Sequence, residues 1–523
     1  MSDKQLIIST DALETRIALL EKDRVAELFI ERQSERGMVG NVYLGVVMRV
    51  LPGMQSAFIN IGADRTAFLY GGDVLDPEVL KEARQLAEAE NASSEFPVSE
   101  ASMDLTTEDL RDRNLKSRRP IEKLIREGQE ILVQVAKEPL GSKGARVTTF
   151  ISIPGRYLVL MPDFTHIGIS RRIEDPTERQ RLTELVKQFK PENIGVIVRT
   201  AALGLSDLVL QKDLKFLLKV WKLVDAKRKR SSAPSLIYRD LSLILKTTRD
   251  LYSEEIDRIV IDNAEACEEL RRFLMATIPG AHKKLYLYEE KTPIFDVYGI
   301  EMDIGKALSS RIELPSGGYL IIDQTEALTS FDVNTGKFVG LASARDTILK
   351  TNLEAVKKIV AQLRTRNIGG IIVIDFIDME KPEDREKVFN ALQEELKTDK
   401  ARTNVLRISE LGLVQMTRKR TSESLERTLM EPCPYCEGRG RIRSTATEAF
   451  DLLREIKRHT LQTGDRKITV RVRDDIKAYI DHEAYPLFQD LIHDFDITID
   501  FKLSHLTRKL LDETPYEVIS SNT

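Results

Sequence analysis

The sequence predicts a multidomain chain of mixed α/β and α+β class. Its 523 residues exceed the roughly 250–300 residues at which single hydrophobic cores stop growing, so several domains are expected. Short β segments punctuated by glycine fill most of the N-terminal part, whereas β and α patterns alternate from Ser316 onward. The first pattern is typical of antiparallel sheets and small barrels, and the second of an open sheet flanked by helices.

The N-terminal part contains a predicted barrel. Residues 1–36 are expected to form strands, because two apolar runs flank a two-residue turn. The barrel spans residues 37–72 and closes with the strand at 127–138. An Ala-, Glu- and Ser-rich stretch, 73–118, interrupts it and lacks sustained apolar periodicity, so this stretch is expected to be a surface insertion.

The remaining elements follow from periodicity. Residues 144–200 are expected to be mainly β, while 207–230 and 235–251 have the three-to-four spacing of helices. Residues 251–308 form a short β/α stretch, and 445–523 alternate helix and strand. Between these last two stretches, the expected strands lie at 318–325, 327–334, 369–379 and 404–416, and the expected helices at 344–366 and 381–399.

Composition indicates a cytoplasmic protein with a polyanionic partner. No apolar run reaches the ~18 residues of a membrane span, and the N-terminus lacks the apolar core of a signal peptide. Net charge is −4, but residues 73–109 hold eleven acidic and two basic residues, which leaves 77 basic against 72 acidic residues elsewhere. Basic clusters lie at 226–230, 417–420 and 438–443. Each one alone is compatible with a solvated surface, whereas together they favour a polyanion.

Two acidic residues, Asp332 and Asp375, lie at the ends of expected strands. One helix separates them, and a strand–helix–strand crossover makes the strands parallel, so both carboxylates are expected at one edge of the sheet. Such a pair suits Mg²⁺. Asn334 shares the strand face of Asp332 and could orient a water or a phosphate. The alternative is that these acids are helix N-caps and turn formers, and Asp378 is a better cap candidate than Asp375.

Two aromatic residues, Phe58 and Phe68, fall in the barrel segments "SAFIN" and "TAFLY". Exposed aromatics of OB-type barrels stack on RNA bases, at roughly 1–3 kcal/mol per base. The alternative is that both rings belong to the barrel core. The Gly-rich loop "PLGSKGA" offers Lys143 as a candidate phosphate contact.

Cys433 and Cys436 form a C-x-x-C knuckle, and the third cysteine, Cys267, lies in a predicted helix where burial is expected. Structural zinc takes four ligands. The two missing thiolates are expected from the same knuckle of a second chain, which gives one Zn²⁺ per two chains in a homodimer. The alternative, a redox C-x-x-C, should open a helix, and two glycines just beyond it oppose this.

Four segments, "IIDQTEALTSFDVN", "TNLEAV", "GGIIVIDFIDM" and "CPYCEGRG", resemble in this order the ribonuclease E/G family of bacterial endoribonucleases. The likeness covers nearly the whole chain, and the 43-residue separation of Asp332 and Asp375 also agrees with the family. Because the sequence ends after a small C-terminal unit, we expect it to be most like the shorter, ribonuclease G-type members.

The resemblance implies a split RNase H-like region with an inserted OB-fold barrel and 5′-sensor domain, a DNase I-like catalytic domain, a zinc link and a small C-terminal α/β domain. The implied bounds are 1–36 and 245–308 for the RNase H-like parts, 37–143 for the OB fold with its acidic insertion at 73–118, 144–244 for the 5′-sensor region and helices, 309–430 for the DNase I-like domain, 431–441 for the zinc link and 442–523 for a dimerisation domain.

The resemblance also implies a function: Mg²⁺-dependent cleavage within single-stranded RNA, leaving 5′-phosphate and 3′-hydroxyl ends, in rRNA and tRNA processing and mRNA decay. It implies zinc-linked dimers that pair into a tetramer. The residues it assigns are Asp332 and Asp375 for Mg²⁺ with Asn334 in support, Phe58, Phe68 and Lys143 for RNA, and Gly155, Val159, Arg199 and Thr200 for a 5′ monophosphate. The alternative from another class is a non-catalytic OB-fold RNA-binding protein.

Overall fold

The computed structural model describes residues 4–33, 37–76, 119–139, 144–336, 343–409, 411–420, 423–436, 438, 440–503 and 516–520. The chain divides into two compact units, Met1–Leu425 and Glu426–Thr523. Within the described ranges, no helix has both the length and the apolar character needed to cross a membrane. Most of the predicted acidic insertion, residues 77–118, lies outside these ranges.

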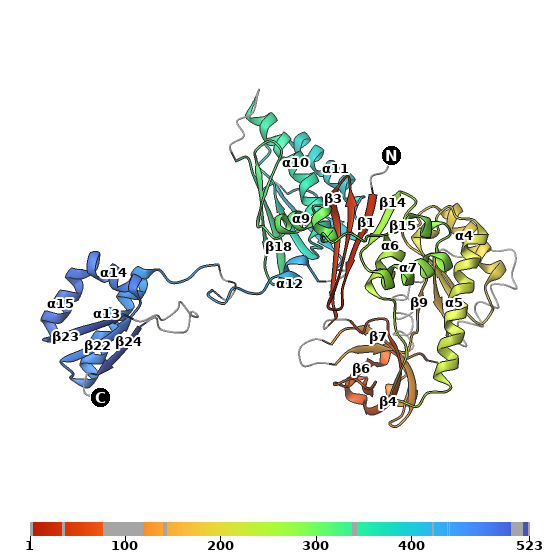
Figure 1. Ribbon diagram of the computed structural model, residues 1–523, viewed down its shortest axis with the longest axis horizontal. Coiled ribbons are helices and arrows are strands. Elements are labelled where there is room, and N and C mark those ends of the chain that lie inside the picture. Colours follow the sequence, from red (N-terminus) through yellow and green to blue (C-terminus); the bar gives the residue numbers. More distant parts are fainter. Residues whose placement is uncertain are drawn as a thin grey trace. The chain divides into compact units, whose positions relative to one another are not determined.

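A five-stranded sheet in the first unit joins segments that are far apart in the sequence (Figure 1), in the order β15–β14–β1–β2–β3. Strands β1, β2 and β3 form an antiparallel meander, and β1 pairs in parallel with β14. Side chains of this sheet pack against α6 and α7 in one core. The bounds are β1 Lys4–Thr10, β2 Glu14–Glu21, β3 Arg24–Arg32, β14 Ile256–Ile261, β15 Leu285–Leu287, α6 Leu243–Leu251 and α7 Ala264–Thr277.

The predicted barrel is present. Its five strands close in the order β4–β5–β6–β8–β7, and β7 pairs back onto β4, which is consistent with an OB fold. Buried side chains such as Val47, Ile59 and Leu69 fill its core. The bounds are β4 Val42–Leu51, β5 Ser56–Asn60, β6 Ala67–Tyr70, β7 Glu130–Lys137 and β8 Arg146–Thr148, with the short helix α3 Ile121–Leu124 beside β4.

A four-stranded sheet follows, in the order β11–β12–β10–β9. The expectation that residues 144–200 are mainly β missed α4, because only Leu182 and Val186 of this polar helix are buried. Its start has a local cause: the Asp175 side chain accepts a hydrogen bond from the Thr177 amide at 3.0 Å. The bounds are β9 Ile153–Pro154, β10 Leu158–Met161, β11 Ile167–Ile169, β12 Gly195–Val198, α4 Pro176–Phe189 and α5 Asp207–Arg228.

The predicted helix at 235–251 is wrong in its first part. Residues Ser235–Tyr238 form β13, which pairs with β4 of the barrel, and only Leu243–Leu251 is helical as α6. The short run Leu-Ile-Tyr has β propensity, and a sheet edge far away in sequence supplies its partner. The shorter helices near the end of the β/α stretch are α8 Ile294–Val297 and α9 Ile300–Ala307.

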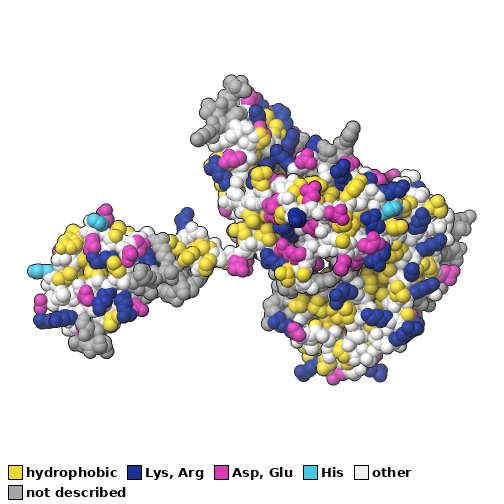
Figure 2. Space-filling model, in the orientation of Figure 1, with side chains coloured by type: hydrophobic (Ala, Val, Ile, Leu, Met, Phe, Trp, Pro, Cys, Tyr) yellow, Lys and Arg dark blue, Asp and Glu magenta, His cyan; other side chains and the backbone are white. Residues whose placement is uncertain are grey.

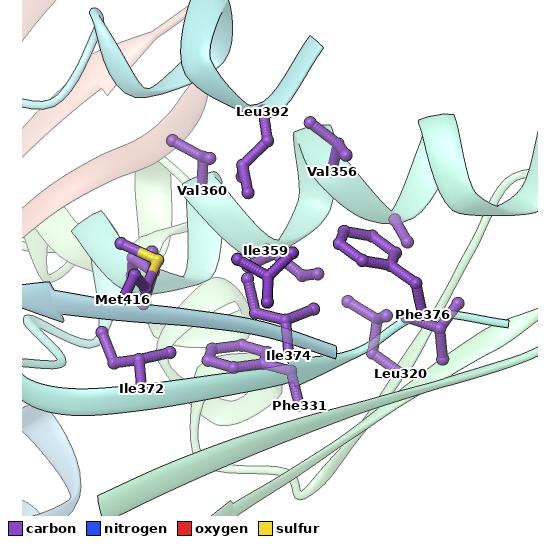
Figure 3. Packing of buried hydrophobic residues seen from close by; sticks show 14 of the residues in the cluster. Leu320, Phe331, Val356, Ile359, Val360, Ile372, Ile374, Phe376, Leu392 and Met416 are labelled. Carbon is purple, nitrogen blue, oxygen red and sulfur yellow. The ribbon is translucent and has the colours of Figure 1, made fainter. Parts of the chain in front are cut away.

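A six-stranded sheet has the order β16–β17–β18–β19–β21–β20. Two helices, α10 (Ala344–Thr365) and α11 (Pro382–Leu396), cover one of its faces. Figure 3 shows Val356, Ile359 and Val360 of α10 and Leu392 of α11 packed against strand residues of the same core. The strand bounds are β16 Arg311–Glu313, β17 Tyr319–Gln324, β18 Leu328–Asn334, β19 Gly370–Asp375, β20 Thr403–Val405 and β21 Leu413–Arg418.

One strand was expected at 404–416, and the structure has two. β20 and β21 pair with each other in antiparallel fashion. Gly412, immediately before β21, has φ +79°, a conformation that glycine adopts at little cost. The chain reverses direction between β20 and β21, and this reversal explains why the apolar pattern of residues 404–416 is interrupted.

The second unit is a small α/β layer built on three strands, in the order β23–β22–β24, with a core of its own. β22 pairs in parallel with β23 and in antiparallel fashion with β24. This matches the alternation of helix and strand predicted for 445–523. The bounds are α13 Thr445–Thr463, β22 Lys467–Val472, α14 Asp474–His482, α15 Tyr485–Phe495, β23 Thr498–Leu503 and β24 Tyr516–Ser520, with α12 Leu425–Leu429 preceding them in sequence.

Candidate active site

Asp332 and Asp375 lie side by side. β18 and β19 run parallel, as the crossover predicted, and the two acids are direct partners in the register. Side chains alternate along strands, so both carboxylates point to the same face. Their neighbours Phe331 and Ile374 are buried beneath α10 and α11, whereas both acids are exposed on the opposite face. The sheet thus presents two carboxylates on its open side.

Asn334 fixes the orientation of one of them. Its Nδ2 donates a hydrogen bond to Oδ2 of Asp332 at 2.9 Å. Tyr319 of β17 is the cross-strand partner of Asn334 and adds an aromatic ring to the same surface. The predicted placement of Asn334 on the strand face of Asp332 agrees with this contact.

Electrostatics make this site attractive to a cation. Burial raises the pKa of the Asp375 carboxyl above its ordinary value, and the negative charges of Asp332 and Asp378 raise it further. Like charges held this close disfavour each other's ionised form. A cation between them would relieve this repulsion.

The helix N-cap alternative is wrong for these acids. α10 is capped by Ser343, and the N-cap residue of α11 is Lys381, which makes no side-chain capping bond. Neither Asp332 nor Asp375 therefore begins a helix, and the expectation that Asp378 caps α11 is wrong as well. Asp378 instead contributes negative charge near Asp375.

Asn352 of α10 is a residue whose position the sequence did not reveal. It is fully buried, and its side chain donates to the Ile377 carbonyl at 2.9 Å and accepts from the Ile377 amide at 3.1 Å. These two bonds hold the segment between Asp375 and Asp378 against the helix. The segment "TNLEAV" showed a polar residue on an apolar face, which was the available hint.

The residues present fit Mg²⁺. Within the described ranges, no group of three or more His, Cys, Asp or Glu side chains is placed to hold a metal ion. Mg²⁺, however, is usually held by one or two carboxylates together with waters and substrate phosphates. Asp332 and Asp375 supply such an all-oxygen pair, which is the ligand type that Mg²⁺ prefers.

The barrel aromatics lie on its outer surface. Phe58 and Phe68 are cross-strand partners with ring centroids 5.7 Å apart, and Tyr70 lies 4.4 Å from Phe68. Both phenylalanines are partly exposed and alternate with buried residues that form the core. The core alternative is therefore wrong for these rings. Tyr70 was not predicted, and Lys143 lies outside the described residues.

Replacing Phe58 or Phe68 with Ala should weaken binding of single-stranded RNA about fivefold to a hundredfold, because each stacked base contributes roughly 1–3 kcal/mol. Filter binding measures the affinity, and thermal melting serves as the control. Leu69→Ala, at the buried position next to Phe68 on β6, should instead lower the melting temperature markedly. An equal loss of stability in the phenylalanine variants would contradict the surface assignment.

The candidate 5′-phosphate residues gather at one end of the β9–β12 sheet. The Arg199 guanidinium donates from Nη1 to the Gly155 carbonyl at 2.7 Å. Val159 is half-buried on β10 opposite Ile197. The Thr200 hydroxyl lies 2.9 Å from the hydroxyl of Ser170.

Arg199 is also paired with an acid that the sequence did not point to. Its Nη2 donates to Asp250 at 2.8 Å. Burial acts to raise the pKa of Asp250, but the hydrogen bond from Arg249 and the charges of Arg249 and Arg199 outweigh it and lower this pKa. A phosphate at Arg199 would therefore share the guanidinium with Asp250.

Gly155 is required by close packing. A Cβ at this position would lie 2.7 Å from an oxygen of Asp213, which is 1% exposed. Burial raises the pKa of Asp213, partly offset by hydrogen bonds from the amides of Tyr157, Leu158 and Arg156. This buried carboxylate thus organises the loop that follows Gly155.

The C-x-x-C knuckle is shaped by its own backbone. Hydrogen bonds from the amides of Tyr435 and Cys436 lower the pKa of the Cys433 thiol, and the Gly440 amide donates to the Cys436 sulfur at 3.3 Å. Cys267 is buried in α7, as expected. Such bonds favour thiolates, which are the form that binds zinc.

Comparison with known proteins identifies the family. Residues 152–421 match the Ribonuclease E/G family. The chain is 40% identical to ribonuclease G of Haemophilus influenzae over 519 residues, 99% of this chain and 100% of that protein. The chain belongs to the ribonuclease E/G family. The family and the enzyme class predicted from the sequence, an endoribonuclease, are thereby confirmed.

Two further relatives place the chain within this family. Identity to ribonuclease G of Escherichia coli (strain K12) is 42% over 463 residues, 88% of this chain and 89% of that protein. Identity to ribonuclease E of the same strain is 36% over 482 residues, 92% of this chain but 43% of that protein. The chain therefore aligns along nearly the full length of the ribonuclease G relatives.

A second family match, RNase E/G, Thioredoxin-like domain, covers residues 432–508. The two cysteines do not occupy a redox position in this unit. They lie in a turn, and the first helix after them, α13, begins at Thr445. A redox C-x-x-C opens a helix, so this arrangement opposes the thiol oxidoreductase alternative.

Proposed function

We propose that this ribonuclease cleaves within single-stranded RNA with Mg²⁺ as cofactor, and acts in rRNA and tRNA processing and mRNA decay. The observation that carries the proposal is the pair Asp332 and Asp375, in register on the open face of the sheet. When bound, Mg²⁺ supplies Lewis-acid chemistry at the phosphodiester and activates water for attack. The products are then 5′-phosphate and 3′-hydroxyl ends.

The chain's own residues supply position and charge. Asp332 and Asp375 provide the oxygen ligands, and Asn334 holds the Asp332 carboxylate in one orientation through its 2.9 Å bond. Asn352 braces the segment that follows Asp375 through Ile377. Preorganisation of this kind lowers the cost of assembling the charged site during the reaction.

RNA binding extends over two further surfaces in this proposal. Phe58 and Phe68 stack on bases, and Lys143 contacts a phosphate. Gly155, Val159, Arg199 and Thr200 recognise a 5′ monophosphate, which Arg199 is suited to bind because a guanidinium pairs with phosphate in bidentate fashion. Its present partner, Asp250, keeps the guanidinium aimed beside Gly155 until a phosphate arrives.

Arg199→Ala should slow cleavage of 5′-monophosphorylated RNA about ten- to a hundredfold, since a hydrogen bond to a charged group contributes roughly 1.5–3 kcal/mol. Cleavage of the same RNA with a 5′ hydroxyl is the control and should change little. Initial rates on the two substrates measure the effect. Equal losses on both would assign Arg199 a purely structural role.

Assembly completes the proposal. Cys433 and Cys436 from two chains hold one Zn²⁺, and such dimers pair into a tetramer. The domains keep the RNase H-like, OB-fold, 5′-sensor, DNase I-like and dimerisation roles implied by family resemblance. The amide-to-sulfur bonds at the knuckle support thiolate ligation, and two-fold symmetry supplies the four ligands that structural zinc requires.

Product analysis tests the reaction class. A single-stranded RNA labelled at its 3′ end should yield labelled 3′-terminal fragments many nucleotides shorter than the substrate, and their new 5′ ends should carry phosphates. Shortening by single nucleotides would contradict internal cleavage. Tight binding without any cleavage would favour the alternative, a non-catalytic OB-fold RNA-binding protein.

A further inference from the structure

Helix α5 carries a row of exposed lysines. Lys212, Lys215, Lys219 and Lys222 are all exposed, and their three- and four-residue spacing places them on one side of the helix. The opposite side of α5 is buried against the β9–β12 sheet. Its buried apolar residues are Leu210, Leu214, Leu217 and Val224.

The row is a rigid line of positive charge. At ~1.5 Å rise per residue it is about 15 Å long, with neighbouring lysines about 4.5–6 Å apart along the axis. Within the described part of the chain, these four lysines have no carboxylate partner, whereas Lys229 beyond them is paired with Asp225 at 2.6 Å. In Figure 2, Lys and Arg side chains gather on the part of the first unit where Figure 1 places α5.

Helix stability alone does not account for this pattern. Cations favour the C-terminal turn of a helix, but Lys212 and Lys215 lie in the first half of α5. Like charges three and four residues apart destabilise a helix. A row of this kind is therefore expected to face an anionic partner.

We propose that this lysine row binds the phosphate backbone of a double-helical segment of RNA. Binding of single strands relies on exposed aromatic rings, whereas Phe216 and Trp221 of α5 pack against the core. Duplex RNA is recognised by shape and phosphate contacts, which a straight cationic helix supplies. This inference rests on the proposed action on RNA, and it adds a docking surface for folded parts of a substrate.

A lipid surface fits the helix less well. An interfacial helix inserts an apolar face between lipids. On α5 that face already forms part of a protein core, and only the separate side chains Leu208 and Leu223 are strongly exposed. The feature of α5 that remains available to a partner is therefore its row of positively charged lysines.

The test uses the whole protein with all four lysines changed to Gln. The probe is a blunt RNA duplex of about 20 base pairs, longer than the ~16 that a double-stranded RNA-binding domain spans, with 5′-hydroxyl ends. We expect at least a tenfold weaker affinity at low salt. The slope of log affinity against log salt should fall by about three, since each lost phosphate contact removes roughly 0.7–0.9.

Two matched variants serve as controls. The first control changes four exposed lysines outside α5 to Gln and should leave duplex affinity unchanged. These control lysines are Lys283, Lys291, Lys357 and Lys467. The second control places Arg at all four positions of the α5 row and should also leave duplex affinity unchanged. Cleavage of a short unstructured RNA by the α5 Gln variant should match the wild type.

Unchanged duplex affinity and salt dependence in the α5 Gln variant would overturn the inference. An equal loss of duplex affinity in the variant of the control lysines would also overturn it. The same holds if the α5 Gln variant loses only binding to anionic lipid vesicles. Failure of this inference can be told apart from failure of the proposed function. A wild-type protein that cleaves no RNA counts against the proposed function. Normal cleavage together with unaltered duplex binding in the α5 Gln variant counts only against the α5 surface.

Discussion

Asp332→Asn and Asp375→Asn should each abolish RNA cleavage while RNA binding survives. Each change removes one anionic ligand from the exposed pair on β18 and β19 and leaves the size of the side chain nearly unchanged. Metal-assisted stabilisation of the transition state contributes several kcal/mol, so a loss of about a thousandfold or more is expected. Single-turnover cleavage at saturating RNA measures the rate, and filter binding measures the affinity.

The control for these variants lies on the same sheet. Asp323 of β17 is exposed and is the cross-strand partner of Ser330, two residues before Asp332. Asp323→Asn removes one negative charge from the same face without touching the pair. It should cleave at a near-normal rate. Near-normal rates in the Asp332 or Asp375 variant at high Mg²⁺ would refute the assignment.

Substitution of both Cys433 and Cys436 by Ser should remove zinc and dissociate the assembly. Structural zinc contributes on the order of 10 kcal/mol, far more than the weak surface contacts that could replace it. Metal analysis should find one Zn²⁺ per two wild-type chains and none in the variant. Light scattering should show a lower mass for the variant.

Cys267 provides the matched thiol control. It is buried in α7, and Cys267→Ala removes a cysteine without touching the knuckle. Zinc content and mass should stay at wild-type values. One zinc per chain in the wild type, or an unchanged mass after the double substitution, would contradict a site shared between two chains.

Long periodic segments of the fold were predictable. α10 and α11 agree with the predicted helices to within a few residues at each end, and the closed barrel follows from its glycine-punctuated strands. Errors arose where local pattern and tertiary pairing disagree. Ser235–Tyr238 looks helical in sequence but pairs with β4, and α4 is too polar to show a strong apolar period.

The site was predictable where topology alone fixes it. A parallel crossover requires Asp332 and Asp375 to meet at one edge, and the register makes them direct partners. Contacts between residues of separate elements were not predictable from the sequence. Examples are the bond between Asn352 and Ile377 and the pairing of Arg199 with Asp250. No spacing in the sequence indicates that these residues meet.

Cleavage of one short single-stranded RNA, prepared with a 5′ monophosphate or a 5′ hydroxyl and assayed with and without Mg²⁺, tests the proposed mechanism most directly. We expect internal cleavage of both substrates with Mg²⁺, faster for the monophosphorylated RNA, and none after chelation. Internal cleavage at the full rate without any divalent cation would contradict the assignment of Asp332 and Asp375 as the metal-binding pair.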